Sequence, residues 1–168
     1  MDELEKQGFE TEHLQIYDEA MTPCNSCLSC RLRGDGRCIN EDDRFNDYLD
    51  SLYEADAIVL ASPVYYGSVT AQMKVLMERA GLCSRYAGNR LSRKVGAALV
   101  VQGRKGGLFT HSELVNFMLE SQMIVCPSSG TAVLTASGPK DLEDDEENIR
   151  LIKDLAKELA WLLGRLKS

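Results

Sequence analysis

The chain has 168 residues, of which 44% are hydrophobic and 27% charged, and its formal net charge is −7 at pH 7. This length is enough to bury a sizeable core within one domain. The acidic balance argues against a nucleic-acid partner, because no stripe of Lys and Arg is present to neutralise phosphates. The longest apolar stretches are too short to cross a bilayer and the N-terminus does not have the pattern of a secretory signal, so we expect a cytoplasmic protein.

The N-terminal part is predicted to contain a helix, a strand and an irregular segment. Residues 1–7 are predicted to form the helix. Apolar and polar residues alternate over 12–17, which predicts a half-exposed edge strand. The next segment, 23–38, contains four cysteines and a Gly-Asp-Gly turn signal, and it is predicted to be irregular. We call residues 23–38 the cysteine segment.

The rest of the chain alternates helical patterns with short apolar runs typical of buried strands. Predicted helices cover 42–54, the region from the end of a 62–67 loop to about 80, the region around 114–119, and 142–166; predicted strands cover 57–61, 95–101 and 123–126, with 133–134 as an extension. Strands that alternate with helices indicate a parallel sheet covered by helices on both faces. Ligands of such sheets bind beyond the carboxyl ends of the strands.

Four of the six cysteines follow the spacing Cys24-x2-Cys27-x2-Cys30-x7-Cys38. A reducing compartment opposes disulfides, so this clustering indicates a metal site. Three thiols at intervals of three can wrap a compact iron–sulfur cluster that a fourth thiol closes. Zinc sites more often use two separated CxxC pairs, so the overlapping pairs favour a cubane cluster, with structural zinc and a redox or disulfide arrangement as alternatives. Cys83 is interpreted as a free thiol and Cys126 as a small core side chain.

Two loops follow predicted strands at the carboxyl edge of the sheet. Ser62-Pro63-Val64-Tyr65-Tyr66-Gly67 can present backbone amides and a tyrosine ring to a flat aromatic cofactor. The alternative for this loop is a capped turn with two partly buried tyrosines. Gln102-Gly103-Arg104-Lys105-Gly106-Gly107 is cationic and rich in glycine, and it precedes a helix start that favours anions. It matches neither common nucleotide-binding motif, and the sequence contains no Ser/His/Asp set or carboxylate pair that indicates catalytic residues.

An ordered series of motifs resembles a known family. The series is Pro23-Cys24-x2-Cys27-x2-Cys30, Gly36-x-Cys38, Asp42-Asp43, Ala55-Asp56, the 62–67 loop and Gln72-Met73-Lys74. Over about residues 9–135 it resembles the NADPH-dependent FMN reductase family, and more narrowly the iron–sulfur flavoprotein branch.

The resemblance implies an α/β, flavodoxin-like fold with a doubly wound parallel sheet, and FMN bound non-covalently. It implies a 4Fe-4S cluster held by Cys24, Cys27, Cys30 and Cys38. It also implies that two loops flank the flavin, through Ser62, Pro63, Val64, Tyr65, Tyr66, Gly67, Gln102, Gly103, Gly106 and Gly107. Members of the family assemble as dimers or tetramers, with the cluster of one subunit near the flavin of another.

The start of the chain departs from this family. The first strand of a flavodoxin-like sheet is central, in the order 2-1-3-4-5, and the loop after it holds the FMN phosphate. The chain instead begins with what resembles the end of the first helix. We therefore expect a sheet that lacks its N-terminal first strand, a natural gene product that extends upstream of Met1, and an unpaired apolar edge at residues 57–61.

The expected function is electron transfer through flavin and cluster by an NAD(P)H-dependent FMN reductase-like oxidoreductase. Either NAD(P)H or a ferredoxin-like carrier can be the electron donor, and the other partners are small redox molecules. A non-catalytic zinc-binding or regulatory module on a flavodoxin fold is the alternative. A cluster-independent quinone or azo reductase is a third hypothesis, and it requires dispensable cysteines.

Overall fold

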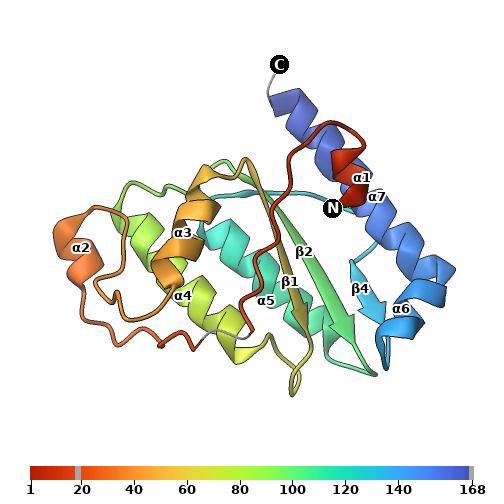
Figure 1. Ribbon diagram of the computed structural model, residues 1–168, viewed down its shortest axis with the longest axis horizontal. Helices are drawn as coiled ribbons and strands as arrows, with labels where there is room; N and C mark the ends of the chain where they lie inside the picture. Colours follow the sequence, from red (N-terminus) through yellow and green to blue (C-terminus); the bar gives the residue numbers. More distant parts are fainter. Residues whose placement is uncertain (18–19, 167–168) are drawn as a thin grey trace.

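The computed structural model describes residues 1–17 and 20–166, which form a parallel sheet with helices around it (Figure 1). The elements are α1 (Asp2–Glu5), α2 (Ser29–Arg33), α3 (Phe45–Glu54), β1 (Ala57–Pro63), α4 (Ala71–Tyr86), β2 (Val95–Gln102), α5 (Gly107–Glu120), β3 (Ile124–Val125), β4 (Val133–Thr135), α6 (Pro139–Asp144) and α7 (Glu146–Leu166). Strands alternate with helices from β1 to β3, and all strand pairs are parallel, so the predicted α/β class is confirmed.

The sheet is built around β2. Its partner on one side is β1, in parallel register from Ala57↔Val95 to Pro63↔Val101. On the other side β2 pairs with β3 near its start and with β4 near its end, both in parallel. Because β1 and β2 are parallel and in register, their carboxyl ends lie next to each other at the same edge of the sheet, where such folds bind ligands.

Helices cover both faces of β2, which explains its continuous apolar sequence. Successive side chains of a strand point to opposite faces. Ala98 and Val100 belong to the core that α3, α4 and α5 cover. Val95 and Ala97 belong to a second core, which α7 covers. Two layers of helices therefore fix the position of β2 and of the loop that follows it.

The predicted edge strand over 12–17 is wrong. The chain runs extended beside β1 (Figure 1), but it forms no strand there. A groove of about 1010 Å³ lies between the two, and Leu14 and Ile16 line it opposite β1. Alternating apolar residues make a strand only where a neighbouring backbone accepts the hydrogen bonds. β1 is therefore an edge strand of the sheet, as expected, and its Val59 side chain is 43% exposed.

Other boundaries differ from the prediction for local reasons. The cysteine segment is not wholly irregular, because it contains α2. The predicted helix over 142–166 is two helices, because Asp145 has extended backbone angles (φ −93°, ψ 105°). The Asp145 carboxylate accepts hydrogen bonds from the backbone N–H groups of Glu147 at 2.8 Å and Asn148 at 3.1 Å, and so caps α7. α4 continues past 80 to Tyr86, since Gly81 lies within the helix opposite Phe117 of α5.

The longest helix, α7, is amphipathic. Leu155, Leu159 and Leu163 are buried at helical spacing, whereas Trp161 on the opposite side is exposed. None of the helices within 1–17 and 20–166 is both long enough and apolar enough to cross a membrane.

Candidate functional site

The cysteine segment folds against α3 and α4, away from the carboxyl ends of β1 and β2 (Figure 1). Cys24, Cys27, Cys30 and Cys38 all line one cavity of about 350 Å³, which we call the cysteine cavity. The wall that faces them comes from α4 and includes Arg79, Leu82, Cys83 and Tyr86. The structure thus brings together the four cysteines that the sequence singles out.

The four cysteines are spread along the wall of this cavity. Within the part of the chain that the structure describes, no three His, Cys, Asp or Glu side chains converge closely enough to bind a single metal ion. Cys24 and Cys27 are exposed, and Cys30 and Cys38 are half-buried. A group bound in the cavity is therefore open to solvent on the side of Cys24 and Cys27 and covered by protein on the side of Cys30 and Cys38.

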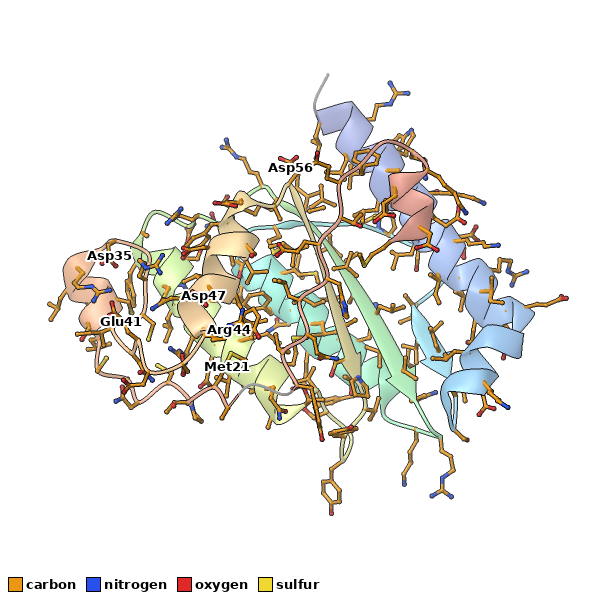
Figure 2. The ribbon with its side chains drawn as sticks, in the orientation of Figure 1. Met21, Asp35, Glu41, Arg44, Asp47 and Asp56 are labelled. Carbon is orange, nitrogen blue, oxygen red and sulfur yellow. The ribbon has the colours of Figure 1, made fainter. Side chains whose placement is uncertain are left out.

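Residues next to the Gly-Asp-Gly turn attach the cysteine segment to α3. α2 lies between left-handed residues at Leu28 (φ 59°) and Gly34 (φ 64°), so the chain reverses direction on both sides of it. The Arg37 guanidinium reaches Asp50 of α3 at 2.5 Å, and the Tyr53 hydroxyl donates to the Gly36 carbonyl at 2.9 Å. Figure 2 shows Asp35 and Glu41 on this side of the molecule, with Arg44 and Asp47 at the start of α3.

Individual cysteines are fixed by polar groups of the neighbouring helices. Glu78 of α4 accepts a hydrogen bond from the Cys24 N–H at 2.8 Å. The buried Asn46 side chain of α3 both accepts from the Cys38 N–H and donates to the Cys38 carbonyl, each at 3.0 Å. Hydrogen bonds from Ser29 lower the pKa of the Cys27 thiol below its ordinary value, which favours the thiolate that metal ligation needs.

Sequence reasoning missed Arg79 and Asn46, and it did not place the free thiol of Cys83 in the wall of the cysteine cavity. Arg79 is buried beside it and forms an ion pair with Asp43 at 2.6 Å. Asn46 holds the backbone of Cys38. Cys83 lies within the cavity wall, where burial and the charges of Cys30 and Cys38 raise its pKa to about 12. A charged or amide residue on the buried face of an otherwise apolar helix is the signal that could have found Arg79 and Asn46.

The 62–67 and 102–107 loops touch each other at the carboxyl ends of β1 and β2. Ser62 and Pro63 still belong to β1 and Gln102 to β2, so the loops themselves are shorter than predicted. The Val64 N–H donates to the Val101 carbonyl at 2.8 Å. A Cβ atom on Gly106, whose φ is +96°, would lie 2.9 Å from the Val64 side chain and 3.1 Å from Gly67 Cα. Glycine at 106 therefore permits the contact between the loops.

These loops present an open surface. Tyr66 is fully exposed and Tyr65 about half-exposed, so only Tyr65 is partly buried, as the alternative of a capped turn expects of both tyrosines. The turn is closed by hydrogen bonds between the backbones of Tyr65 and Ser68, at 3.0 and 3.2 Å. Gly67 and Gly103 both face free space, because a Cβ atom on either would have no neighbour within 4 Å. The surface therefore offers aromatic rings and bare backbone to a ligand.

Comparison with known proteins decides the family. The model of the NADPH-dependent FMN reductase family matches residues 1–137. The chain belongs to this family. An iron–sulfur flavoprotein of Methanocaldococcus jannaschii is 32% identical over 171 residues, which cover 98% of the chain and 86% of that relative. An iron–sulfur flavoprotein of Archaeoglobus fulgidus is 30% identical over 172 residues, which cover 98% of the chain and 87% of the relative. Within the FMN reductase family, the chain thus falls in the iron–sulfur flavoprotein branch.

Solved structures confirm the flavodoxin-like fold of this FMN reductase family member. RosB with a bound 8-demethyl-8-formylriboflavin-5'-phosphate intermediate has a TM-score of 0.77 at 21% identity, over 98% of the chain and 69% of RosB. A flavodoxin, WrbA-like protein from Agrobacterium tumefaciens has a TM-score of 0.60 at 17% identity, over 71% of the chain and 73% of that protein.

Proposed function

We propose that the chain is a flavin- and iron–sulfur-dependent oxidoreductase that takes electrons from NAD(P)H and passes them on singly. Membership of the NADPH-dependent FMN reductase family supports the flavin-dependent oxidoreductase activity. The observation that carries the iron–sulfur part of the proposal is the arrangement of Cys24, Cys27, Cys30 and Cys38 around one cavity.

The cysteine cavity fits a cluster by its donor set and its size. Four thiols are the ligand set of a 4Fe-4S cluster, and each thiol needs to reach a different iron. Ligands of a cluster therefore stand around a volume, and the four cysteines line one cavity of about 350 Å³. In the proposal Cys24, Cys27, Cys30 and Cys38 hold the cluster, and Glu78 and Asn46 keep two of these ligands in place.

The open surface at the carboxyl ends of β1 and β2 fits the flat ring of FMN. Tyr65 and Tyr66 offer exposed rings, and Gly67 and Gly103 leave the space above their backbones free. Aromatic packing and backbone donors are what a buried flavin ring needs on its two sides. In the proposal residues 62–67 and 102–107 flank the isoalloxazine, with Gly67 and Gly103 allowing close approach, whereas Gly106 and Gly107 face neighbouring protein atoms.

FMN accepts two electrons from a hydride donor and can release them singly, and an iron–sulfur cluster carries one electron at a time. Within one chain the two sites are separate, because the lining of the cysteine cavity includes no residue of the 62–67 or 102–107 loops. We propose that a second copy of the chain brings its cysteine cavity to the flavin loops, and that small redox molecules or a ferredoxin-like carrier exchange electrons with the pair.

Counting iron, acid-labile sulfide and FMN after anaerobic purification tests this proposal. Wild type is expected to contain iron and sulfide in equal amounts, and Cys27→Ser is expected to lose both. Cys126→Ser is the matched control, because Cys126 is buried in the core under α7, remote from the cysteine cavity. Stoichiometric zinc without sulfide in wild type would reject the cluster and leave a zinc-binding module.

A further inference from the structure

Arg79 of α4 is the one cation among the residues that line the cysteine cavity in the described chain. We propose that Arg79 closes the cysteine segment around the cluster and raises the cluster's reduction potential through its positive charge at the cavity wall. This inference rests on the proposed function. Arg79 is a positioning residue, since it acts on the ligands and not on a substrate.

The charge of Arg79 is almost completely removed from water. Its side chain is 2% exposed, and that of its partner Asp43 is 6% exposed, with 2.6 Å between Nη1 and Oδ2. The guanidinium also lies over the Phe45 ring, 4.0 Å from the ring centroid. An Arg side chain is rarely so buried unless its N–H donors have hydrogen-bond acceptors or an ion-pair partner. The acceptors around Arg79 therefore indicate what this side chain does.

The ion pair ties together the two ends of the cysteine segment. Arg79 donates to the Thr22 carbonyl at 3.0 Å, and Asp43 accepts from the Thr22 N–H at 2.9 Å. Thr22 lies two residues before Cys24. At the other end, Arg79 contacts the carbonyl of Asn40 at 3.5 Å, two residues after Cys38. One guanidinium therefore spans the entry and the exit of a chain segment that carries all four ligands.

Arg79 also places a positive charge at the wall of the cavity that the four cysteines line. A guanidinium stays protonated in proteins, so this charge is permanent. Nearby charge is one of the main determinants of cluster potential. A buried cation stabilises the more negative, reduced cluster and so raises the potential.

Lysine cannot replace this arrangement. The planar guanidinium reaches Asp43, Thr22 and Asn40 in different directions, whereas an ammonium is a compact point charge without the fork. A buried ion pair that only holds the fold would contribute to stability but would leave the cluster potential unchanged. The potential therefore separates the two roles.

The test compares Arg79→Lys and the double variant Arg79→Met/Asp43→Asn with wild type. The double variant removes both charges of the buried pair and leaves none unpaired, so we expect it to fold. Arg85→Met is the control, since Arg85 is on the same helix but pairs with Glu120 on the surface. Each protein is purified anaerobically, its iron and sulfide are counted, and its cluster potential is measured by a titration with redox dyes that is followed by electron paramagnetic resonance.

We expect a lower potential and less iron in the double variant, a smaller change in the same direction for Arg79→Lys, and wild-type values for Arg85→Met. If the double variant retains no cluster, the potential of Arg79→Lys tests the inference: a lower potential than that of wild type supports it, and an unchanged potential overturns it. Wild-type potential and iron content in both Arg79 variants would overturn the inference. Absence of sulfide from the wild type would instead overturn the proposed function, so the two failures are distinguishable.

Discussion

Asn46 of α3 holds Cys38 with both ends of its amide, accepting from the Cys38 N–H at 3.0 Å and donating to the Cys38 carbonyl at 3.0 Å. Its Nδ2 also contacts the Asn40 carbonyl at 3.4 Å. Cys38 is separated from the other three clustered cysteines by the longest gap in the sequence. Its position therefore depends on a neighbouring helix more than on its own loop.

Asn46→Ala is expected to weaken cluster retention and to cost about 1–3 kcal/mol of unfolding free energy, because it leaves buried backbone groups without partners. Asn46→Asp keeps an acceptor for the Cys38 N–H but loses both donors, so we expect an intermediate effect. Asn116→Ala, on the exposed face of α5, is the control. Iron content and urea unfolding measure the two effects. Full iron content and wild-type stability of Asn46→Ala would contradict the role of this amide.

Asp43 is expected to make the free energy of unfolding depend on pH. Burial would raise its pKa, but hydrogen bonds from Arg79, Thr22 and Phe45 outweigh burial and hold the pKa below its ordinary value. Such a carboxylate stabilises the folded state fully above its unfolded pKa of about 3.9, and this contribution is lost as the pH falls through the folded pKa.

Asp43→Asn should therefore be less stable than wild type at pH 6, by about 3–5 kcal/mol for a broken buried pair. The difference between the two proteins should shrink as the pH falls below about 4. Thermal unfolding from pH 6 to pH 3 measures it, with Asp47→Asn at an exposed position as the control. A difference that stays constant over this range would show that the ionised Asp43 contributes nothing specific.

Gly103→Val tests the flavin loops more cleanly than a change at Gly67. Gly67 has a φ of +85°, so any side chain there strains the backbone with or without a ligand. Gly103 has no such constraint, and a Cβ atom on it meets only free space. A side chain at 103 therefore obstructs a flavin without disturbing the fold.

We expect Gly103→Val to raise the FMN dissociation constant about tenfold, or ~1.4 kcal/mol. Gly164→Val in α7 is the matched control. A Cβ atom at position 164 also meets free space, and this position is far from both loops in the sequence. Quenching of FMN fluorescence gives both constants. Equal affinities for wild type and Gly103→Val would mean that the 102–107 loop does not border the flavin.

Asp145→Ala is expected to lower the unfolding free energy by about 1 kcal/mol, because α7 loses the acceptor for its first N–H groups. Glu158→Ala, at an exposed position in the middle of the same helix, should have little effect. Urea unfolding of both variants measures the difference. Equal stabilities would argue against a separate start of α7 at this residue.

The sequence predicts best those features that depend on neighbouring residues. The apolar run of β2 predicts a buried strand, because burial on two faces leaves a local pattern, and the close spacing of the four cysteines predicts that they lie together, as they do around one cavity. The ion pair of Arg79 with Asp43 leaves none, since the two residues are 36 positions apart. The alternation over 12–17 misleads for the opposite reason: the pattern is local, but a strand requires a partner that only the tertiary structure supplies.

A reductive titration of the FMN-loaded protein tests most directly whether each chain carries both a flavin and a cluster. Wild type is expected to take up about three electrons per chain, two on FMN and one on the cluster, while FMN-loaded Cys27→Ser takes up about two. Absorption follows the flavin, and electron paramagnetic resonance follows the cluster, as NAD(P)H or dithionite is added anaerobically. Equal electron uptake by wild type and Cys27→Ser would contradict an iron–sulfur site at these cysteines.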